Sequence, residues 1–490
     1  MKKESFKYYD RLGFMNPNYI INNNEIRVNE KFHEIVRQKD TINKIDIVSI
    51  IEILNRGYAF SDRTIIKDIQ KTPWMAKPSE VTESWDYVKD LPEHGQNSID
   101  DKEIADSLFS RLVVEIREYI GDKSTIGILL SGGMDSRVVS AVIKYLQDSK
   151  EIDVTVVALT WGKENSRDVI YAEKIVKLFN WEWKHFKLNS ENLIENIEVA
   201  AENGAAYSPV HLHAMPKIRE LKSIDCIIAG SFGDSIGRAE YSGIKVQNLT
   251  SLSNVVMNRF KILKNSVYKE YNNQVKYDLE IYHTLFPRHE LYQEYELERQ
   301  LHYMRKQLNQ CMSIIDQKIP LYQAFTAPKV FGYMWSLSPE CRTDKVYYNI
   351  LEKYSPKLLN IPWARNGCKY LTENCDYSDG YSKNYHSYGK WIREDLYPLL
   401  KTKVLSKAVE DLNIFNMDAL EKLFWINSFS NQESLTKTDE HLIWLASLSD
   451  CVKMYDIKGI EDKNFSFQDS IDGKFTSALH YIAYNLKLKL

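Results

Sequence analysis

Apolar positions in residues 101–245 alternate between two periodicities. KEIADSLFSRLVVEIREYI (102–120) and SRDVIYAEKIVKLFNW (166–181) place their apolar side chains on one face of a helix. IGILL (126–130), DVTVVALTW (153–161), WEWKHFKL (181–188) and DCIIAGSF (225–232) are short, largely apolar runs of strand length. Apolar strands that alternate with amphipathic helices are typical of a parallel sheet buried between helices. The pattern therefore predicts an α/β fold.

The flanking regions carry different patterns. Residues 1–97 mix short apolar stretches with turns, and we expect a strand edge in NEIRVNEKF (24–32) and a short helix in IDIVSIIEILNRGY (45–58). The polar piece 90–101 is the best linker candidate. From about residue 246 the pattern is mostly helical. We predict a small α+β domain over 1–97 and a larger domain over 98–490, with an α/β core at about 101–245 and a helical extension at about 246–490.

Composition narrows the class of protein. Of 490 residues, 44% are hydrophobic and 27% charged, with a net charge of −3, which is typical of a soluble globular chain. A near-neutral balance argues against a protein that coats nucleic acid. No secretory signal and no apolar run approaching roughly 18 residues is seen, so we expect no membrane contact and a cytoplasmic location. The 6 cysteines form no CxxC pair, and we expect reduced core thiols.

The strongest chemical signal is the turn Ser131–Ser136, which lies between a predicted strand and a predicted helix. Gly132 and Gly133 let the backbone approach a ligand closely, and the free N–H groups of the next helix favour an anion. Neither GxxxxGK[ST] nor GxGxxG is present. Asp135 would repel phosphate unless a cation intervened, which suggests Mg²⁺. The alternative is a tight turn with Asp135 or Ser136 as the helix N-cap.

The string LLSGGMDSRVVSAV (129–142) resembles the SGGxDS pyrophosphatase loop of the asparagine synthetase and β-lactam synthetase family. The resemblance implies an adenine nucleotide alpha hydrolase-like fold that binds ATP and Mg²⁺ and releases AMP and pyrophosphate. It also implies that the nucleotide contacts Leu130, Ser131, Gly132, Gly133, Asp135 and Ser136, and that Leu159 and Thr160 hold the adenine and ribose.

A second glycine cluster, AGSFGDSIGRAEYSG (229–243), follows another predicted strand and is expected at the same sheet edge. It is similar to the family's GEGSDE-type loop, which implies nucleotide contacts at Gly230 and Ser231 and a magnesium contact at Asp234. Asp135 and Asp234 would then hold the metal together. The family's Glu or Tyr acid/base is missing near Ser231. The open candidates are Glu202, Tyr207, His211, His213, Glu240 and Tyr241, with the two histidines pointing apart if they lie on a strand.

A third segment, from about residue 320 to 370, resembles the family's helical stretch that ends in a phosphate-binding lysine loop. Arg365 or Lys369 is nearest to that lysine, and Lys345 and Lys353 are further candidates. Any one basic residue is more often a solvated surface charge.

The N-terminal region resembles the end of the family's glutaminase domain at about half its length. The sequence begins MKKES and has no cysteine before Cys226, so the N-terminal nucleophile of glutamine-using relatives is missing. We predict a truncated, inactive remnant. The nitrogen would then come from ammonia, a separate protein or an amine on the substrate.

Together these observations predict an ATP-dependent amide-bond-forming ligase. It would adenylate a small-molecule or peptide carboxylate and transfer it to an amine or ammonia, by intramolecular cyclisation in some relatives. Asp135, Asp234, Arg365, Lys369 and Glu202 are the catalytic candidates. Two alternatives stay open, a degenerate scaffold subunit and an ATP pyrophosphatase acting on another substrate such as a nucleic-acid base. A partner protein or homo-oligomer is compatible with either.

Overall fold

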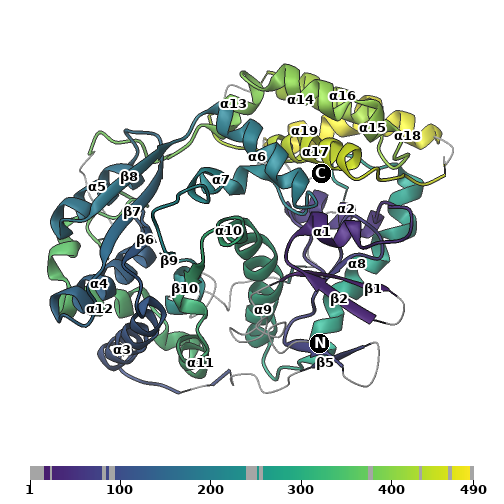
Figure 1. Cartoon of the computed structure of the whole chain (residues 1–490). Helices are drawn as coiled ribbons and strands as arrows, with labels where there is room; N and C mark the ends of the chain where they lie inside the picture. Colours follow the sequence, from purple (N-terminus) through teal and green to yellow (C-terminus); the bar gives the residue numbers. More distant parts are fainter. Residues whose placement is uncertain are drawn as a thin grey trace.

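A five-stranded parallel sheet organises the α/β core of the protein (Figure 1). The computed structural model describes residues 16–22, 25–79, 84–87, 94–95, 97–238, 251–252, 258–372, 379–429, 433–461 and 466–485. The strands are β6 (Thr125–Leu129), β7 (Thr155–Gly162), β8 (Glu182–Lys187), β9 (Cys226–Ala229) and β10 (Leu321–Gln323), in the order β10-β9-β6-β7-β8. All four pairings are parallel. The α/β prediction is confirmed.

Helices cover both faces of this sheet, because its side chains alternate between two cores. Ile126 and Ile128 of β6 pack with α3 (Asp101–Ile120), α4 (Met134–Asp148) and α12 (Asp344–Tyr354). Leu129 belongs to the other core, with α6 (Ser190–Glu202) and α17 (Lys437–Met454). α5 (Arg167–Phe179) connects β7 to β8 as the sequence predicts.

The N-terminal region is a small α+β unit. Its elements are β1 (Asn18–Asn22), β2 (Glu25–Asn29), β3 (Gln70–Lys71), β4 (Ala76–Pro78), β5 (Trp85–Tyr87), α1 (Phe32–Arg37) and α2 (Ile47–Arg56). β2, β1 and β3 form an antiparallel sheet, and β4 pairs with β5. The strand predicted in 24–32 and the helix predicted in 45–58 are confirmed as β2 and α2. The proposed linker at 90–101 lies mostly outside the described residues.

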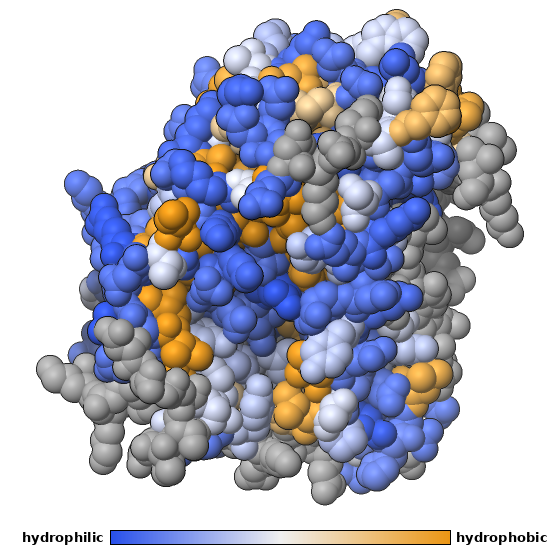
Figure 2. Space-filling view, turned by 90° about the vertical axis from the view of Figure 1, so that its right-hand side faces the viewer, coloured by the Kyte–Doolittle hydropathy of each residue, from blue (hydrophilic) through white to orange (hydrophobic). Residues whose placement is uncertain are grey.

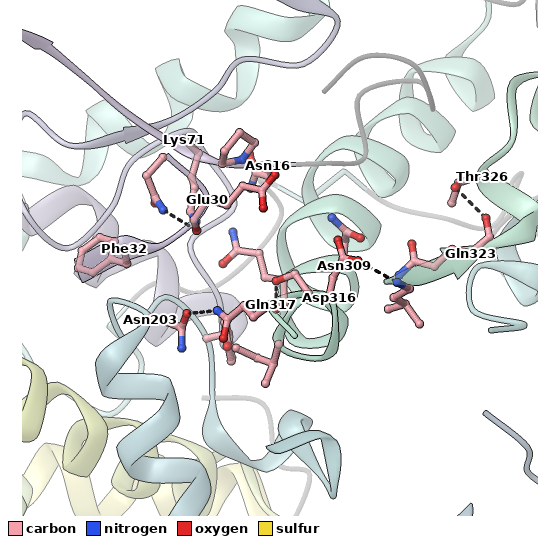
Figure 3. Close-up of a pocket in the computed structure, with 17 residues that line it drawn as sticks. Asn16, Glu30, Phe32, Lys71, Asn203, Asn309, Asp316, Gln317, Gln323 and Thr326 are labelled. Carbon is pink, nitrogen blue, oxygen red and sulfur yellow. Dashed lines mark hydrogen bonds between the residues drawn. The ribbon is translucent and has the colours of Figure 1, made fainter. Parts of the chain in front are cut away.

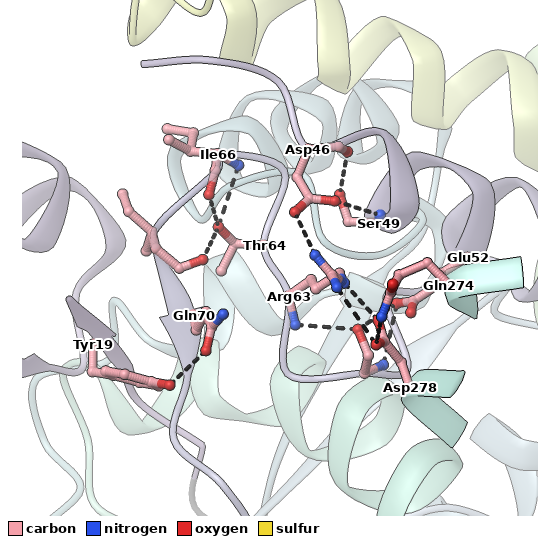
Figure 4. A network of polar contacts seen from close by, with 12 residues as sticks. Tyr19, Asp46, Ser49, Glu52, Arg63, Thr64, Ile66, Gln70, Gln274 and Asp278 are labelled. Carbon is pink, nitrogen blue, oxygen red and sulfur yellow. Dashed lines mark hydrogen bonds and ion pairs between the residues drawn. The ribbon is translucent and has the colours of Figure 1, made fainter. Parts of the chain in front are cut away.

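Buried polar contacts join this N-terminal unit to the C-terminal part (Figure 4). Arg63 contacts Asp46 at 3.0 Å and Asp278 of α8 (Asn265–Leu285) at 2.5 Å. The neighbouring Glu52 accepts hydrogen bonds from Ser61, and burial raises its pKa to about 8. Apolar side chains of α2 share one core with α17. The boundary near residue 97 stays a prediction, since this core crosses it.

The C-terminal half is mostly helical, as predicted. Besides α8, α12 and α17 it contains α9 (Leu291–Glu298), α10 (Asn309–Asp316), α11 (Pro328–Ser336), α13 (Tyr388–Arg393), α14 (Tyr397–Val404), α15 (Lys407–Glu410), α16 (Met417–Asn427), α18 (Phe467–Ile471) and α19 (Ser477–Asn485), and a π-helical segment η5 (Arg299–Leu308). Of the helices in the described ranges, none combines the length and the apolar character that a membrane crossing requires. The face in Figure 2 is mainly hydrophilic, with scattered hydrophobic residues.

His211 lies in a 3₁₀ helix, η2 (Pro209–Leu212), and His213 follows it, because Pro209 sets the first helical turn. The two histidines therefore do not lie on a strand. The expectation of reduced cysteines is wrong at one position. Cys368 is disulfide-bonded rather than reduced. The other described cysteines are free thiols, namely Cys226, Cys311, Cys341 and Cys451.

Candidate functional site

The Ser-Gly-Gly turn lies at the carboxyl edge of β6, the central strand of the sheet. Leu130 N–H donates to the Leu159 carbonyl at 2.9 Å, and the Thr160 hydroxyl donates to the Leu130 carbonyl at 2.9 Å. Gly133, not Asp135 or Ser136, is the N-cap of α4, and it provides no side-chain cap. The first N–H groups of α4 therefore face the turn without a capping side chain.

The two glycines of the turn serve different purposes. A Cβ at Gly132 would meet Ala364 Cβ at 2.7 Å, so this glycine allows another segment to pack against the turn. A Cβ at Gly133 would meet only Ser131 Oγ, at 3.1 Å. Gly133 thus presents open space and the helix N-terminus to the same side, which suits an anionic phosphate group.

Arg137, one turn into α4, fixes the segment that covers the turn. Its fully buried guanidinium donates to the carbonyls of Leu358 at 3.1 Å, Ile361 at 2.7 Å, Pro362 at 2.9 Å and Gly132 at 3.1 Å. Burial lowers the pKa of Arg137 to about 10, so it stays charged at neutral pH. One side chain therefore holds residues 358–364 against the Ser-Gly-Gly turn.

A cleft of about 380 Å³ opens beside this turn. It is lined by Gly133, Asp168, Asp234, Arg238, Trp363, Ala364, Arg365, Lys383, Asn384, Tyr385 and His386. The structure therefore brings together three predicted site residues from distant parts of the chain, Gly133, Asp234 and Arg365. The basic side chains Arg238, Arg365 and Lys383 give the cleft the charge that a polyphosphate requires.

Asp135 does not stand open to this cleft as a metal ligand. Arg238 Nε contacts its Oδ1 at 3.0 Å and Nη2 contacts its Oδ2 at 3.4 Å, while Arg238 Nη1 contacts Asp344 at 3.2 Å. Burial alone would lower the pKa of Arg238, but the contact with Asp135 raises it well above its usual value.

A magnesium site built on Asp135 therefore does not fit this arrangement, because a guanidinium already contacts both carboxylate oxygens. Within the described ranges, no three His, Cys, Asp or Glu side chains are placed to share a metal ion. The prediction that Asp135 and Asp234 jointly bind Mg²⁺ has no support in this arrangement of side chains.

Asp168, on the first turn of α5, is the carboxyl group in the cleft with a shifted pKa. Burial raises the pKa to about 6, although the Gly132 N–H donates to its carboxylate and opposes the shift. A group with this pKa can exchange a proton near neutral pH. Asp168 is not among the site residues that we predicted from the sequence.

The other predicted nucleotide contacts surround the turn. Ser136 Oγ lies 3.3 Å from Ser131 Oγ. A Cβ at Gly230 would approach the Asp135 backbone to 2.7 Å, so that glycine lets the two loops touch. Ser231 follows it, and Phe232 adopts a left-handed φ of 70°, a strained backbone for a bulky residue. Leu159 and Thr160 are buried beneath the turn.

Several candidate residues lie elsewhere. Glu202 is exposed at the end of α6, beside His33 and Tyr455, and the structure does not bring it to the cleft. Lys369 is exposed and does not line the cleft. Lys353 pairs with Asp106 at 2.7 Å.

The remaining candidates for an acid or base do not line the cleft, although His213 Nε2 lies 3.4 Å from the hydroxyl of Tyr385, which does. Tyr207 is buried, His211 contacts Gln307, and His213 contacts Tyr388 at 2.7 Å. Lys345, a phosphate candidate, lies on the first turn of α12 and is exposed. Glu240 and Tyr241 lie outside the described residues.

Sequence reasoning missed Lys383, His386 and Arg137. Lys383 and His386 belong to a polar loop without a motif that we recognised. Their approach depends on the backbone pairing of Ser382 with Asn165 and Arg167. Arg137 looked like an ordinary polar position on an amphipathic helix, and three of its four partners lie more than 220 residues away.

This geometry matches what comparison of the sequence with known families finds. Residues 117–237 match the asparagine synthase family. The match covers β6, β7, β8 and β9, the Ser-Gly-Gly turn and the second glycine cluster as far as Gly237, and it confirms the resemblance for that segment. No curated protein matches the sequence.

Two solved structures are also similar. NMN synthetase from Francisella tularensis aligns over 52% of this chain and 97% of its own, with 14% identity and a TM-score of 0.20. U34-tRNA thiolase NcsA from Methanococcus maripaludis, solved with its 4Fe-4S cluster, aligns over 60% of this chain and 97% of its own, with 13% identity and a TM-score of 0.20. With TM-scores this low, the fold assignment rests on the sheet topology described above.

Proposed function

We propose that the cleft binds ATP and that the protein joins a carboxylate to an amine, releasing AMP and pyrophosphate. The observation that carries the proposal is the uncapped N-terminus of α4, which opens at Gly133 into a cleft lined by Arg365 and Lys383. The asparagine synthase match over 117–237 supports ATP as the nucleotide.

In the proposed reaction a carboxylate oxygen of the substrate attacks the α-phosphorus of ATP and pyrophosphate leaves. An amine then attacks the acyl carbon, AMP leaves, and the nitrogen loses one proton. Arg365 and Lys383 offset the charge of the leaving pyrophosphate, and the N–H groups of α4 hold its oxygens. Arg238 contributes positive charge but stays paired with Asp135 and Asp344.

Asp168 is the proposed acceptor for the amine proton. It lies in the cleft, and with a pKa of about 6 it is mostly ionised at neutral pH and can take up a proton. His386 lines the same cleft, but burial lowers its pKa to about 4, so it is a weaker base.

The test is ATP-dependent release of AMP and pyrophosphate across a panel of carboxylic acids and amines, with products read by mass spectrometry. Asp135→Asn should reduce release about 100-fold or more, because Arg238 loses the partner that fixes its position. Asp148→Asn is the control, at the exposed far end of the same helix.

Calorimetric titration with ATP complements this assay. Absence of ATP binding would favour the scaffold alternative. Release of ADP rather than AMP would contradict the proposed reaction.

A further inference from the structure

A second cavity, of about 110 Å³, lies between the N-terminal sheet and the end of the parallel sheet. Figure 3 shows Lys71, Asn16, Glu30 and Phe32 on one side and residues of α10 on the other. Its walls also include Gln323, the last residue of β10, which pairs with Ala229 of β9. The cavity therefore reaches the sheet edge that carries the second glycine loop.

Lys71, on β3, is the unusual group in this cavity. The residue is 8% exposed, and no described carboxylate forms an ion pair with its ammonium group. Holding an ammonium group in a largely buried position without an acidic partner is costly in free energy. Burial, with the neighbouring Lys306 and Arg305, lowers the pKa of Lys71 to about 7.

Two further basic side chains near Lys71, those of Lys306 and Arg305, add to the positive charge around the cavity. Lys306 contacts Asp62 at 2.5 Å, and Arg305 contacts the same carboxylate at 3.5 Å. One carboxylate thus serves two cations and is not available to Lys71. An anion in the cavity would supply the missing negative charge.

The inner walls carry amide and hydroxyl groups. Asn18, Gln310, Gln323 and Thr326 are all buried there. Side-chain amides both donate and accept hydrogen bonds. They suit a ligand with several polar atoms, not a bare inorganic ion.

The acidic residues of the lining lie at its exposed side. Glu30 and Asp316 are both exposed, whereas Lys71 is buried. Negative charge at the cavity's exposed side and positive charge at its buried side disfavour a dianion such as phosphate. A phosphate ion would have to pass both carboxylates on entry. A ligand with one carboxylate facing inward and a neutral or cationic group facing outward fits the gradient.

We propose that this cavity binds a small organic carboxylate whose oxygens accept hydrogen bonds from the Lys71 ammonium. A cavity of about 150 Å³ holds a molecule the size of benzene, so the ligand has about six non-hydrogen atoms or fewer. An α-amino acid and an unsubstituted acid share the carboxylate and are distinguished below. The site is separate from the ATP cleft, and the proposal does not depend on the proposed function.

Calorimetry on the full-length protein tests this site, with propionate, L-alanine, propionamide and inorganic phosphate as probes. Propionate or L-alanine should bind, whereas propionamide, which has the same shape without the charge, should bind at least tenfold more weakly. Tighter binding of L-alanine would identify an amino-acid site, and tighter binding of propionate an unsubstituted one.

Variants locate the contact. Lys71→Met should weaken carboxylate binding at least tenfold, Lys71→Arg should retain part of it, and the exposed Lys67→Met is the matched control. ATP binding should be unchanged in all three. At pH 8 carboxylate binding should take up protons, seen as a buffer-dependent enthalpy, because the anion favours protonated Lys71. Asp62, Glu30 and Asp316 act in the same direction, whereas Arg305 and Lys306 oppose protonation.

Four results would overturn the proposal. They are equal binding of propionate and propionamide, binding of phosphate alone, unchanged affinity in Lys71→Met, and no binding of any carboxylate. If Lys71→Met fails to fold, the comparison of propionate with propionamide on the unaltered protein still decides the question.

Discussion

Two regions of this protein each bury a basic side chain, but only one of them provides acidic partners for its charge. At the edge of the parallel sheet, Arg238 lies between Asp135 and Asp344, and its pKa is raised. Beneath the N-terminal sheet, Lys71 has no acidic partner among the described residues, and its pKa is lowered to about 7. The charge of Arg238 is balanced by carboxylates of the protein itself, whereas the charge of Lys71 favours binding of an external anion.

Arg137 represents a third solution. Its guanidinium is fully buried, and its two Nη atoms donate to four backbone carbonyls rather than to carboxylates. Carbonyl dipoles offset part of the burial penalty, and the pKa falls only to about 10. Burial alone therefore does not determine a cation's behaviour; its partners do.

The largest expected effect is on Arg137. Arg137→Met should lower the free energy of unfolding by about 3–5 kcal/mol, because several buried carbonyls lose their donor. Urea denaturation measures this. Arg117→Met, which removes a half-exposed pair with Glu151, should change the same quantity by less than about 1 kcal/mol. Similar losses in both variants would contradict the special position of Arg137.

A double-mutant cycle measures the interaction free energy between Arg238 and Asp135. Arg238→Met and Asp135→Asn should each destabilise the fold, and the double variant should show a coupling free energy of about 1–3 kcal/mol. Urea denaturation of the four proteins provides the values. A coupling near zero would mean that Arg238 does not depend on Asp135.

Unlike the substitutions above, Lys71→Met should increase the free energy of unfolding. The increase should be about 1–3 kcal/mol at pH 6 in carboxylate-free buffer. The folded pKa lies below that of an unfolded lysine, so the unfolded state binds more protons between pH 7 and about 10. Stability of the unaltered protein should rise over that window, and the advantage of Lys71→Met should shrink. Thermal unfolding at pH 6, 7.5 and 9 measures both, and destabilisation at pH 6 would show that Lys71 is already compensated.

Metal binding tests whether Arg238 prevents Asp135 from acting as a metal ligand. Removal of the guanidinium in Arg238→Met should free the carboxylate and raise affinity for Mn²⁺ about tenfold, as measured by electron paramagnetic resonance. Adding Asp135→Asn should abolish the gain. Equal affinity in the unaltered protein and in Arg238→Met would show that Arg238 does not block a metal there.

The smallest expected effect concerns Asp168. The rate of amide formation should fall as pH drops below about 6, because the carboxylate becomes protonated. Asp168→Asn should remove this limb and lower the rate about tenfold at pH 7.5. An unchanged pH profile in the variant would assign the limb to another group.

Much of the fold could be predicted from the sequence. Apolar strand-length runs predicted four strands of the sheet, and the Ser-Gly-Gly turn indicated which edge of the sheet carries the cleft. β10 was not predicted, because it has only three residues and lies after a long helical region. The N-terminal unit was predicted as a separate domain, but its core contacts with α17 depend on tertiary packing that periodicity does not report.

The site was predictable only in part. Gly133, Asp234 and Arg365 were identified from motifs and do meet in the cleft. Glu202 was chosen for its position in the sequence, yet α6 carries it to an exposed end far from the turn. The pairing of Asp135 with Arg238 was missed, since spacing along the chain cannot show that a neighbouring loop supplies its own cation.

The four carbonyl contacts of Arg137 have a consequence for how the protein can be divided. A shortened chain that ended at residue 340 would keep all five strands but would lack residues 358–364. The Arg137 guanidinium would then keep only the Gly132 carbonyl as a hydrogen-bond acceptor. The cleft beside the Ser-Gly-Gly turn is therefore completed by sequence that lies beyond the last strand. Under the proposed function, a minimal unit that contains only the sheet should no longer bind ATP.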